Sequence, residues 1–539
     1  MNSKESKVIT NKNLILFLIS ILILVSFCSL LFIDNHSLVA HDESLYATRA
    51  KLIIDTNNWF TPFEKAHHKT IGSYWLIALS FKIFGISEFS ARLPSYIFSI
   101  LSSFVLFKIL KDISSWKIGI ISVITLSSSF IWFSYGRYCS PDTLYIFLNL
   151  LSVLYLLKTN NFLEERINNK YLFISGLFLS LPFFVRSYLQ LLPLIGLFPL
   201  ILFKIKKLSA IKTRYFITGF FVGLIPLIIY YFISYRIYGL DSFIRPYMLL
   251  QQKALTENDI FEGFLFYPRN LILLTTPLFI FLINGTKYIL KNKSREIQIL
   301  LVFTPFINII ILMLTASKYS HYGLFTIPLL ASNASFGIYE SFKNKSNSSK
   351  LTLRIFGGLM LLISTLIFLV SIFNFNLNII SQLGLIERFL LSLLLLISIF
   401  LSLNLFYKTN SKSQNINKIL LIFIIQIFIL NIFFTNGIIG NPNNDFKDFI
   451  AQPDIKKIIK NNPIYIIGEL DDKNYYLFQF YLPNSKLVKT TQIPKLETYY
   501  GLISDKDIIK FNDSIKHKFI NLKKFKNVNF IKINKKNFL

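Results

Sequence analysis

The chain has 539 residues, of which 53% are hydrophobic and only 16% are charged, and it contains 56 Phe. Soluble domains average about 45–50% apolar and about 25% charged residues, so this composition excludes an ordinary soluble protein. The net charge of +29 does not indicate nucleic-acid binding, because Lys and Arg collect in short loops between apolar runs, as they do where charge sets membrane topology.

Apolar runs long enough to span a bilayer recur along most of the first 440 residues and predict a multi-pass membrane protein. The basic N-terminus and the run 14–33 predict a signal anchor whose N-terminus is cytoplasmic. As a helix, the segment 71–86 would cover only about 24 Å, and it carries Lys82, so we expect it to lie in the membrane interface. With the first run, about 13 spans are predicted. The further spans are expected near 92–110, 116–135, 141–158, 171–187, 188–205, 215–235, 268–286, 297–316, 321–340, 352–376, 386–406 and 418–438.

The distribution of basic loops fixes the expected orientation. With this order of spans, the loops rich in Lys and Arg lie in the cytoplasm, as the positive-inside rule requires. The opposite loops, among them the long first loop 34–91, hold most of the acidic, His and Tyr clusters. Five charged residues far apart in sequence are therefore expected at one extracytoplasmic face, where sites are usually built: Asp42, Lys69, Asp142, Arg186 and Lys318.

Residues 441–539 differ from the transmembrane region, residues 1–440, because they are polar and rich in Lys and Asn. Helix and strand signals alternate, which predicts a small α/β domain, on the extracytoplasmic side by parity. Its Lys side chains either contact anionic lipid head groups or are simply solvated. The domain either binds an acceptor or only stabilises the helical bundle.

The stretch SLVAHDESLYATRA, residues 37–50, follows directly on the first apolar run and holds His41, Asp42 and Glu43. On one interpretation these residues are a polar connection and the acidic first turn of a helix, since acidic side chains favour a helix N-terminus. On the other, a partly desolvated carboxylate at the membrane face acts as a general base on an acceptor.

Further along the chain, Lys69 follows His67 and His68. Its ammonium either snorkels at a helix end or binds an anionic group such as a phosphate. Two adjacent His without further spaced ligands are a weak metal signal, so we expect no metal cofactor, with a divalent ion as the alternative. Asp142, after Pro141, either initiates the span 141–158 or orients an acceptor.

Arg186 lies where two apolar runs join with almost no loop, and a guanidinium held there usually has an anionic partner. Lys318, His321 and Tyr322 lie at the outer end of a later span, where Lys and Tyr are also common membrane anchors. Cations and carboxylates on one face suggest an anionic lipid substrate, handled by an enzyme or by a carrier.

Five motifs carry a resemblance to a known family across roughly residues 10–440. They are HDESLYATRAKLIIDTNNW, HHKTIGSYWLIALSFKIFGISEFSARLPS, GRYCSPDTL, SLPFFVRSYLQLLPL and ASKYSHYGLFTIPLLA. In this order they resemble motifs of the glycosyltransferases of the protein O-mannosyltransferase superfamily, which have the GT-C fold. The nearest branch is the one that includes the aminoarabinose transferase acting on lipid A.

The resemblance implies an all-α GT-C membrane protein with extracytoplasmic juxtamembrane helices, in the inner (plasma) membrane. Asp42 would be the catalytic carboxylate, Glu43 would support it, and Asp142 would orient the acceptor. The donor's phosphate would be held by cations, with tyrosines lining the cavity. These implied binding residues are Lys69, Arg186 and Lys318, and the tyrosines are Tyr46 and Tyr322.

The donor implied by the resemblance is a polyprenyl-phosphate sugar, and the acceptor is a lipid, a glycan or a protein. Transfer would invert the anomeric centre. Arg186 stands where the family usually has Lys, and Thr70 stands where a Pro is usual. Two alternatives remain open: a transporter or flippase of lipid-linked glycans, and a catalytically inactive homologue.

Overall fold

The structure is a computed structural model, and it describes most of the chain. The described residues are 26, 30–40, 42–67, 69–159, 169–205, 210–255, 260–315, 318–343, 347–373, 383–407, 412–439, 445–467, 472–482, 485–488, 498–509, 519–525 and 528–534. The expected first span, 14–33, lies almost entirely outside them.

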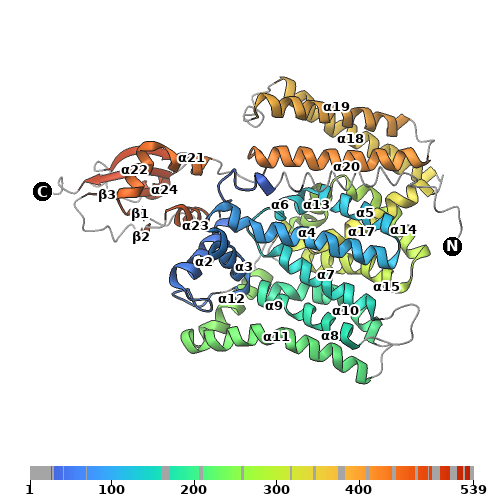
Figure 1. The fold of residues 1–539 in the computed structure, drawn as a ribbon, viewed down its shortest axis with the longest axis horizontal. Helices are drawn as coiled ribbons and strands as arrows, with labels where there is room; N and C mark the ends of the chain where they lie inside the picture. Colours follow the sequence, from blue (N-terminus) through green and yellow to red (C-terminus); the bar gives the residue numbers. More distant parts are fainter. Residues whose placement is uncertain are drawn as a thin grey trace.

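Helices dominate the described residues up to 439, and most run along one axis of an elongated bundle (Figure 1). In order they are α2 (Asp42–Thr56), α3 (Gly72–Phe84), α4 (Glu88–Ile113), α5 (Trp116–Ser128), α6 (Phe130–Tyr135), α7 (Asp142–Lys158), α8 (Asn169–Ser180), α9 (Pro182–Arg186), η2 (Ser187–Gln190), α10 (Leu191–Ile205), α11 (Ala210–Tyr238), α12 (Asp241–Leu255), α13 (Ile260–Thr275), η3 (Leu278–Phe281), α14 (Leu282–Asn292), α15 (Arg295–Gln298), η4 (Ile299–Phe303), α16 (Thr304–Leu314), η5 (Ser320–Gly323), α17 (Thr326–Lys343), α18 (Asn347–Phe373), α19 (Leu385–Tyr407) and α20 (Lys412–Thr435).

The chain is a multi-pass membrane protein, but the described residues, which leave out most of the predicted first span, contain fewer long apolar helices than the 13 or so spans that the sequence predicts. Among the described residues, seven helical runs are long and apolar enough to cross a membrane, or eight if the pair Phe264–Thr275 and Leu278–Asn292, bent by 103°, is one span. Several predicted spans are shorter helices, such as α5 with 13 residues and α7 with 17. Sequence hydropathy overestimates their length because a break at Ser129 and loops near Asp142 interrupt the apolar runs.

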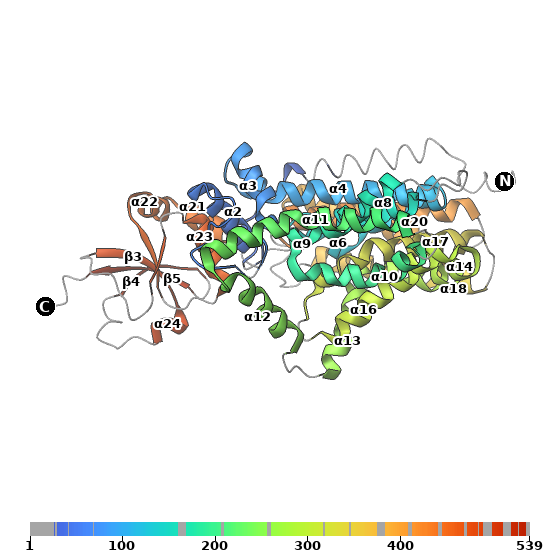
Figure 2. The ribbon, with the colours of Figure 1, turned by 90° about the horizontal axis from the view of Figure 1, so that it is seen from below.

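One candidate span accounts for two of the expected ones. The run Asn169–Ile205 has 37 residues, which as a straight helix would measure about 55 Å, far more than a hydrocarbon core of about 30 Å. α9 and η2 interrupt it, and α8 and α10 occupy the same length of the bundle in Figures 1 and 2. The chain therefore reverses at α9, which carries Arg186.

The expected helix over 71–86 is confirmed as α3, which has only 13 residues and an apolar composition. It lies with α2 at the end of the bundle next to the C-terminal sheet (Figure 1). α4 begins beside it with a capping box, in which the Ser87 hydroxyl accepts from the Ser90 N–H and the Ser90 hydroxyl accepts from the Ser87 N–H. This cap fixes the entry of α4 at the site end of the bundle.

The small C-terminal α/β fold is also confirmed. Its helices are α21 (Asp445–Ala451), α22 (Pro453–Asn461), α23 (Asp472–Tyr481) and α24 (Asp505–Ile509), and its strands are β1 (Ile464–Ile467), β2 (Lys486–Val488), β3 (Thr498–Ser504), β4 (Phe519–Phe525) and β5 (Val528–Asn534). The five-stranded sheet has the order β2-β1-β3-β5-β4, in which β1 pairs in parallel with β2 and β3, and the other pairs are antiparallel. The predicted domain boundary at 440/441 falls outside the described residues and stays a prediction.

The two faces of this sheet have different roles. Tyr465, Tyr499 and Ile531 lie in a small core on one face. On the other face, Ile466 and Phe530 belong to a larger apolar cluster that continues through α23 into α2 and α3. The α/β domain therefore shares a hydrophobic core with the first helices after residue 41.

Candidate active site

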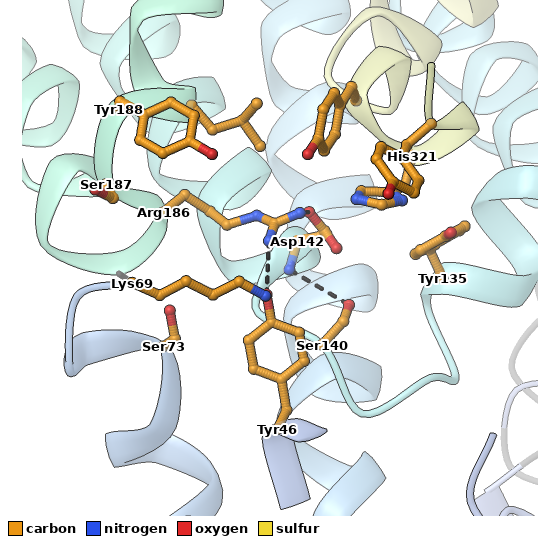
Figure 3. Close-up of a pocket in the computed structure, with 13 residues that line it drawn as sticks. Tyr46, Lys69, Ser73, Tyr135, Ser140, Asp142, Arg186, Ser187, Tyr188 and His321 are labelled. Carbon is orange, nitrogen blue, oxygen red and sulfur yellow. Dashed lines mark hydrogen bonds and ion pairs between the residues drawn. The ribbon is translucent and has the colours of Figure 1, made fainter. Parts of the chain in front are cut away.

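An open cavity lies where α2, the start of α3, the connection from α6 to α7, the turn after α9 and η5 meet. Including its mouth, it holds about 740 Å³ of space not filled by atoms. Its lining residues are Tyr46, Lys69, Ser73, Tyr135, Ser140, Asp142, Arg186, Ser187, Tyr188, Leu189, Tyr319, His321 and Tyr322 (Figure 3). The structure thus brings together five of the eight site residues predicted from the sequence: Tyr46, Lys69, Asp142, Arg186 and Tyr322.

Two cations converge on one hydroxyl oxygen. Lys69 Nζ donates to Tyr46 Oη at 3.1 Å, and Arg186 Nη1 donates to the same oxygen at 2.7 Å. The Lys69 ammonium also lies 4.5 Å from the centre of the Tyr46 ring. Tyr46 itself is only 3% exposed, so helix α2 holds the bridging hydroxyl in place. Two like charges this close repel each other, and an anion bound beside them would relieve that repulsion.

Arg186 has the anionic partner that the sequence predicts. Its Nη2 lies 2.5 Å from Asp142 Oδ1, and the two side chains are 8% and 4% exposed. Pro182 starts α9 and Ser187 adopts a positive φ of 53°, which ends the helix directly after Arg186 and turns the chain. Among the described lining residues, Lys69, Arg186 and Asp142 together carry one net positive charge.

The Arg186 guanidinium keeps a spare donor. An arginine has five N–H donors, and Arg186 uses Nη1 for Tyr46 and Nη2 for Asp142. Its Nε is buried and has no hydrogen-bond partner among the residues that the structure describes. Buried polar groups are nearly always hydrogen-bonded, so Nε is unused hydrogen-bonding capacity on a guanidinium that lines the cavity.

Aromatic side chains form a second wall of the cavity. The His321 ring lies 5.6 Å from Tyr135, 5.6 Å from Tyr319 and 4.7 Å from Tyr322, measured between ring centres. Figure 3 shows His321 and Tyr135 on the side of Asp142 away from Lys69. The Tyr322 hydroxyl is placed on this wall and can donate a hydrogen bond. The cavity therefore has a cationic half and an aromatic half.

Glu43 does not line this cavity. Its carboxylate accepts from Arg92 Nε at 2.8 Å and Nη2 at 2.7 Å, and from the backbone N–H groups of Val39 and Cys139, each at 2.7 Å. A carboxylate offers about four lone-pair sites, and these four donors occupy them. Since Glu43 is 1% exposed, it ties the start of α2 to α4 and to the segment before α7. This is a supporting position behind the site.

The Lys318 ammonium points to the end of a helix and not into the cavity. Its ammonium donates to the carbonyls of Leu312 at 3.1 Å, Met313 at 2.8 Å and Thr315, where α16 ends. A lysine has three N–H donors, and the unpaired carbonyls at a helix C-terminus take all three. Lys318 is absent from the cavity lining, because a helix end only a few residues upstream competes for its charge.

Asp42 begins α2, one helical turn before Tyr46. Its side chain, like residues His41 and His68, lies outside what the structure describes, so its catalytic assignment stays a prediction.

Several residues at or behind the cavity were not assigned from the sequence. Arg92, which pairs with Glu43, carried a usable signal, since a charged residue in an apolar helix generally has a buried partner. Tyr135, Ser140 and Tyr188 carried no signal beyond closeness in sequence to Asp142 or Arg186. Among the described residues, no group of three or more His, Cys, Asp or Glu side chains is placed to hold a metal ion.

Comparison with known proteins identifies the fold that carries this cavity. The model of the dolichyl-phosphate-mannose-protein mannosyltransferase family matches residues 68–231. The crystal structure of ArnT from Cupriavidus metallidurans bound to undecaprenyl phosphate aligns with a TM-score of 0.73 at 12% identity, over 96% of this chain and 98% of ArnT. The chain has the GT-C fold. The predicted resemblance to the aminoarabinose transferase branch is thereby confirmed.

Two curated relatives share the name undecaprenyl phosphate-alpha-4-amino-4-deoxy-L-arabinose arabinosyl transferase. The protein of Wigglesworthia glossinidia brevipalpis is 27% identical over 207 residues, which is 37% of this chain and 35% of that protein. The protein of Aeromonas hydrophila is 26% identical over 196 residues, 34% of this chain and 35% of that protein. The chain matches only about a third of the length of these curated relatives, in contrast to the nearly complete alignment of the GT-C fold.

Proposed function

We propose that this GT-C chain is an integral membrane glycosyltransferase, which moves a sugar from a polyprenyl-phosphate donor to an acceptor at the extracytoplasmic face. The observation that carries the proposal is the convergence of Lys69 and Arg186 on the Tyr46 hydroxyl, in an open cavity at one end of an apolar bundle. The names of the curated relatives, and the undecaprenyl phosphate bound to the aligned ArnT, support this choice of donor.

The charge of the cationic half suits a lipid phosphodiester. Such a donor carries one negative charge, which matches the net charge of Lys69, Arg186 and Asp142. When the bond between the anomeric carbon and the phosphate oxygen breaks, the electron pair stays on that oxygen and the leaving polyprenyl phosphate gains a second negative charge. The Lys69 ammonium and the Arg186 guanidinium, with its unpaired Nε, stabilise this developing charge.

The acceptor completes the step. Its hydroxyl oxygen forms the new bond to the anomeric carbon on the face opposite the phosphate, which inverts the anomeric centre. The hydroxyl proton passes to a carboxylate, for which Asp42 at the start of α2 is the candidate. Asp142 holds Arg186 and borders the same cavity, so it is placed to orient the acceptor. The sugar ring lies against the aromatic half. No resident metal is assigned to this step, and independence of divalent cations stays a prediction.

We further propose the inner (plasma) membrane as the location, with a cytoplasmic N-terminus and an extracytoplasmic α/β domain. Segments that carry Lys, among them the connection from α14 to α15, lie at the end of the bundle away from that domain (Figure 1). Lys293 Nζ donates to Ser114 Oγ at 3.1 Å, and Lys204 pairs with Glu296 at 2.8 Å. Under the positive-inside rule this end is cytoplasmic.

A reconstitution experiment tests the proposal. The purified protein in lipid vesicles would be incubated with a panel of undecaprenyl-phosphate pentoses and hexoses and with envelope lipid, glycan and peptide acceptors, and release of undecaprenyl phosphate would be followed by mass spectrometry. Mass spectrometry of the lipid-linked sugars that accumulate in cells lacking the protein would show which donor to include in this panel. We expect release by the wild type and at least about 100-fold slower release by Asp42→Asn. Translocation of the donor without release would identify a flippase instead. If the protein neither releases nor translocates the donor, it is an inactive homologue.

A further inference from the structure

Helix α23 of the C-terminal domain packs directly against α2. In both views the two helices lie next to each other between the sheet and the bundle (Figures 1 and 2), and their apolar residues belong to one buried cluster. Leu45, Ala47 and Ala50 of α2 share this cluster with Leu477 and Phe478 of α23. The domain is thus attached to the one helix that carries both Asp42 and Tyr46.

Tyr476 of α23 makes specific contacts with the middle of α2. Its carbonyl accepts from Thr48 Oγ1 at 2.8 Å, and its hydroxyl oxygen accepts from Arg49 Nη2 at 3.1 Å. The Arg49 guanidinium lies 5.4 Å from the centre of the Tyr476 ring and 4.8 Å from the centre of the Phe63 ring. Arg49 is therefore held between the C-terminal domain and the first loop, three residues after Tyr46.

Tyr481, the last residue of α23, fixes the segment that leads into α2. Its hydroxyl oxygen accepts from the Leu38 N–H at 2.9 Å, and the hydroxyl donates to Glu88 Oε1 at 3.0 Å. Leu38 lies four residues before Asp42. Lys447 of α21 adds an ion pair to Glu88 at 3.1 Å and a hydrogen bond to the Asp34 carbonyl at 2.9 Å. The ten-residue helix α23 therefore contacts both the segment before α2 and the middle of α2.

From these contacts we propose that α23 is a positioning element of the active site: Tyr476 and Tyr481 set the position of α2, and with it Asp42 and the Tyr46 hydroxyl that joins the two cations. This inference rests on the proposed function for its catalytic consequence. Neither tyrosine lines the cavity, so they act on transfer only through α2. The domain therefore contributes to turnover even where it does not touch the acceptor.

The chain offers a matched control in the same domain. Tyr499 is 3% exposed and lies in the core on the other face of the sheet. Its hydroxyl is buried and has no hydrogen-bond partner among the described residues. Tyr499→Phe therefore removes the same atom from the same domain without touching α2.

The test compares Tyr476→Phe, Tyr481→Phe and Tyr499→Phe in the full-length protein in lipid vesicles. Two quantities would be measured: hydrogen–deuterium exchange of residues 37–56, and kcat and KM for release of undecaprenyl phosphate from its lipid-linked sugar. We expect each of the first two variants to speed exchange in 37–56 and to lower kcat about three- to tenfold, the loss that one hydrogen bond typically causes. Donor KM should change less than about twofold, since Lys69 and Arg186 lie outside α2 and Arg186 stays paired with Asp142, and Tyr499→Phe should match the wild type.

Arg49→Gln gives a second line of evidence. If Arg49 and Tyr476 act as a pair, the double variant Arg49→Gln/Tyr476→Phe should lose no more kcat than the more impaired single variant. The inference is overturned if exchange in 37–56 is unchanged, or if exchange rises and kcat does not fall. A wild type that releases no undecaprenyl phosphate from any donor would defeat the proposed function instead, and the exchange measurement would then decide the structural claim alone.

Discussion

Replacing Arg186 by Lys tests whether the fork of the guanidinium, and not only its charge, serves the cavity. The substitution restores the residue usual in the resembling family. In this structure Arg186 joins Tyr46 Oη at 2.7 Å and Asp142 Oδ1 at 2.5 Å through two different nitrogens. A lysine carries its three N–H donors on one nitrogen at the end of a flexible stem, so it cannot reach Tyr46 Oη and Asp142 Oδ1 with the spacing of two separate guanidinium nitrogens.

The loss follows from the number of bonds. One hydrogen bond to a charged group contributes about 1.5–3 kcal/mol, and about 1.4 kcal/mol corresponds to a tenfold change in rate. Arg186→Lys should therefore lower kcat/KM for release of polyprenyl phosphate about 10- to 150-fold. The assay is the reconstituted release reaction with a saturating acceptor and a titrated lipid-linked donor.

An exposed arginine far from the cavity supplies the control. Arg295 starts α15, at the end of the bundle away from α2 and α3 (Figure 1), and its guanidinium lies 5.7 Å from the centre of the Phe303 ring, so Arg295→Lys should leave kcat/KM unchanged. If Arg186→Lys turns over within twofold of the wild type while keeping its affinity for donor, the two-bond account of the cationic half is wrong.

Three further outcomes are expected. Glu43→Gln should lower the free energy of unfolding by about 3–5 kcal/mol, because it leaves the buried Arg92 charge without its partner; thermal unfolding in detergent measures this, and a shift of the melting temperature below about 2 °C would contradict it. Lys318→Met should keep the transfer rate within about threefold. It should lower the free energy of unfolding by about 1 kcal/mol, because the Lys318 ammonium caps α16. Weaker donor binding in this variant would show that Lys318 does contact the donor. Extensive dialysis against EDTA should leave transfer unchanged, and restoration of lost activity by Mg²⁺ or Mn²⁺ would show that a metal takes part.

Much of the fold could be predicted from the sequence, because local runs of apolar and basic residues largely determine membrane topology. Apolar runs and basic loops located most of the long helices among the described residues and brought Lys69, Asp142 and Arg186 to one face. The interruption at α9 and η2 was also foreseeable, as a hairpin around Arg186. Helix lengths were less accurate, because a break such as Ser129 within an apolar run hardly changes its average hydropathy.

The aromatic half of the cavity could not be predicted in the same way. Tyr135 ends α6 and Tyr319 lies between α16 and η5, and among the 27 Tyr of the chain nothing local selects these two. The attachment of α23 to α2 was equally hidden, since it joins residues more than 400 positions apart, such as Thr48 and Tyr476. Contacts of that range are set by tertiary packing, on which periodicity and composition carry no information.

The charged residues that look alike in the sequence differ in how many of their hydrogen-bonding positions are already occupied. Glu43 has four donors for about four acceptor sites, and Lys318 has three acceptors for its three protons, so neither has capacity left for a substrate. Arg186 has an unpaired Nε and borders open space. A sequence pattern gives the type and approximate location of a charge but not how completely neighbouring groups satisfy it. That degree of satisfaction distinguishes charges that hold the bundle together from charges that remain able to bind a phosphate.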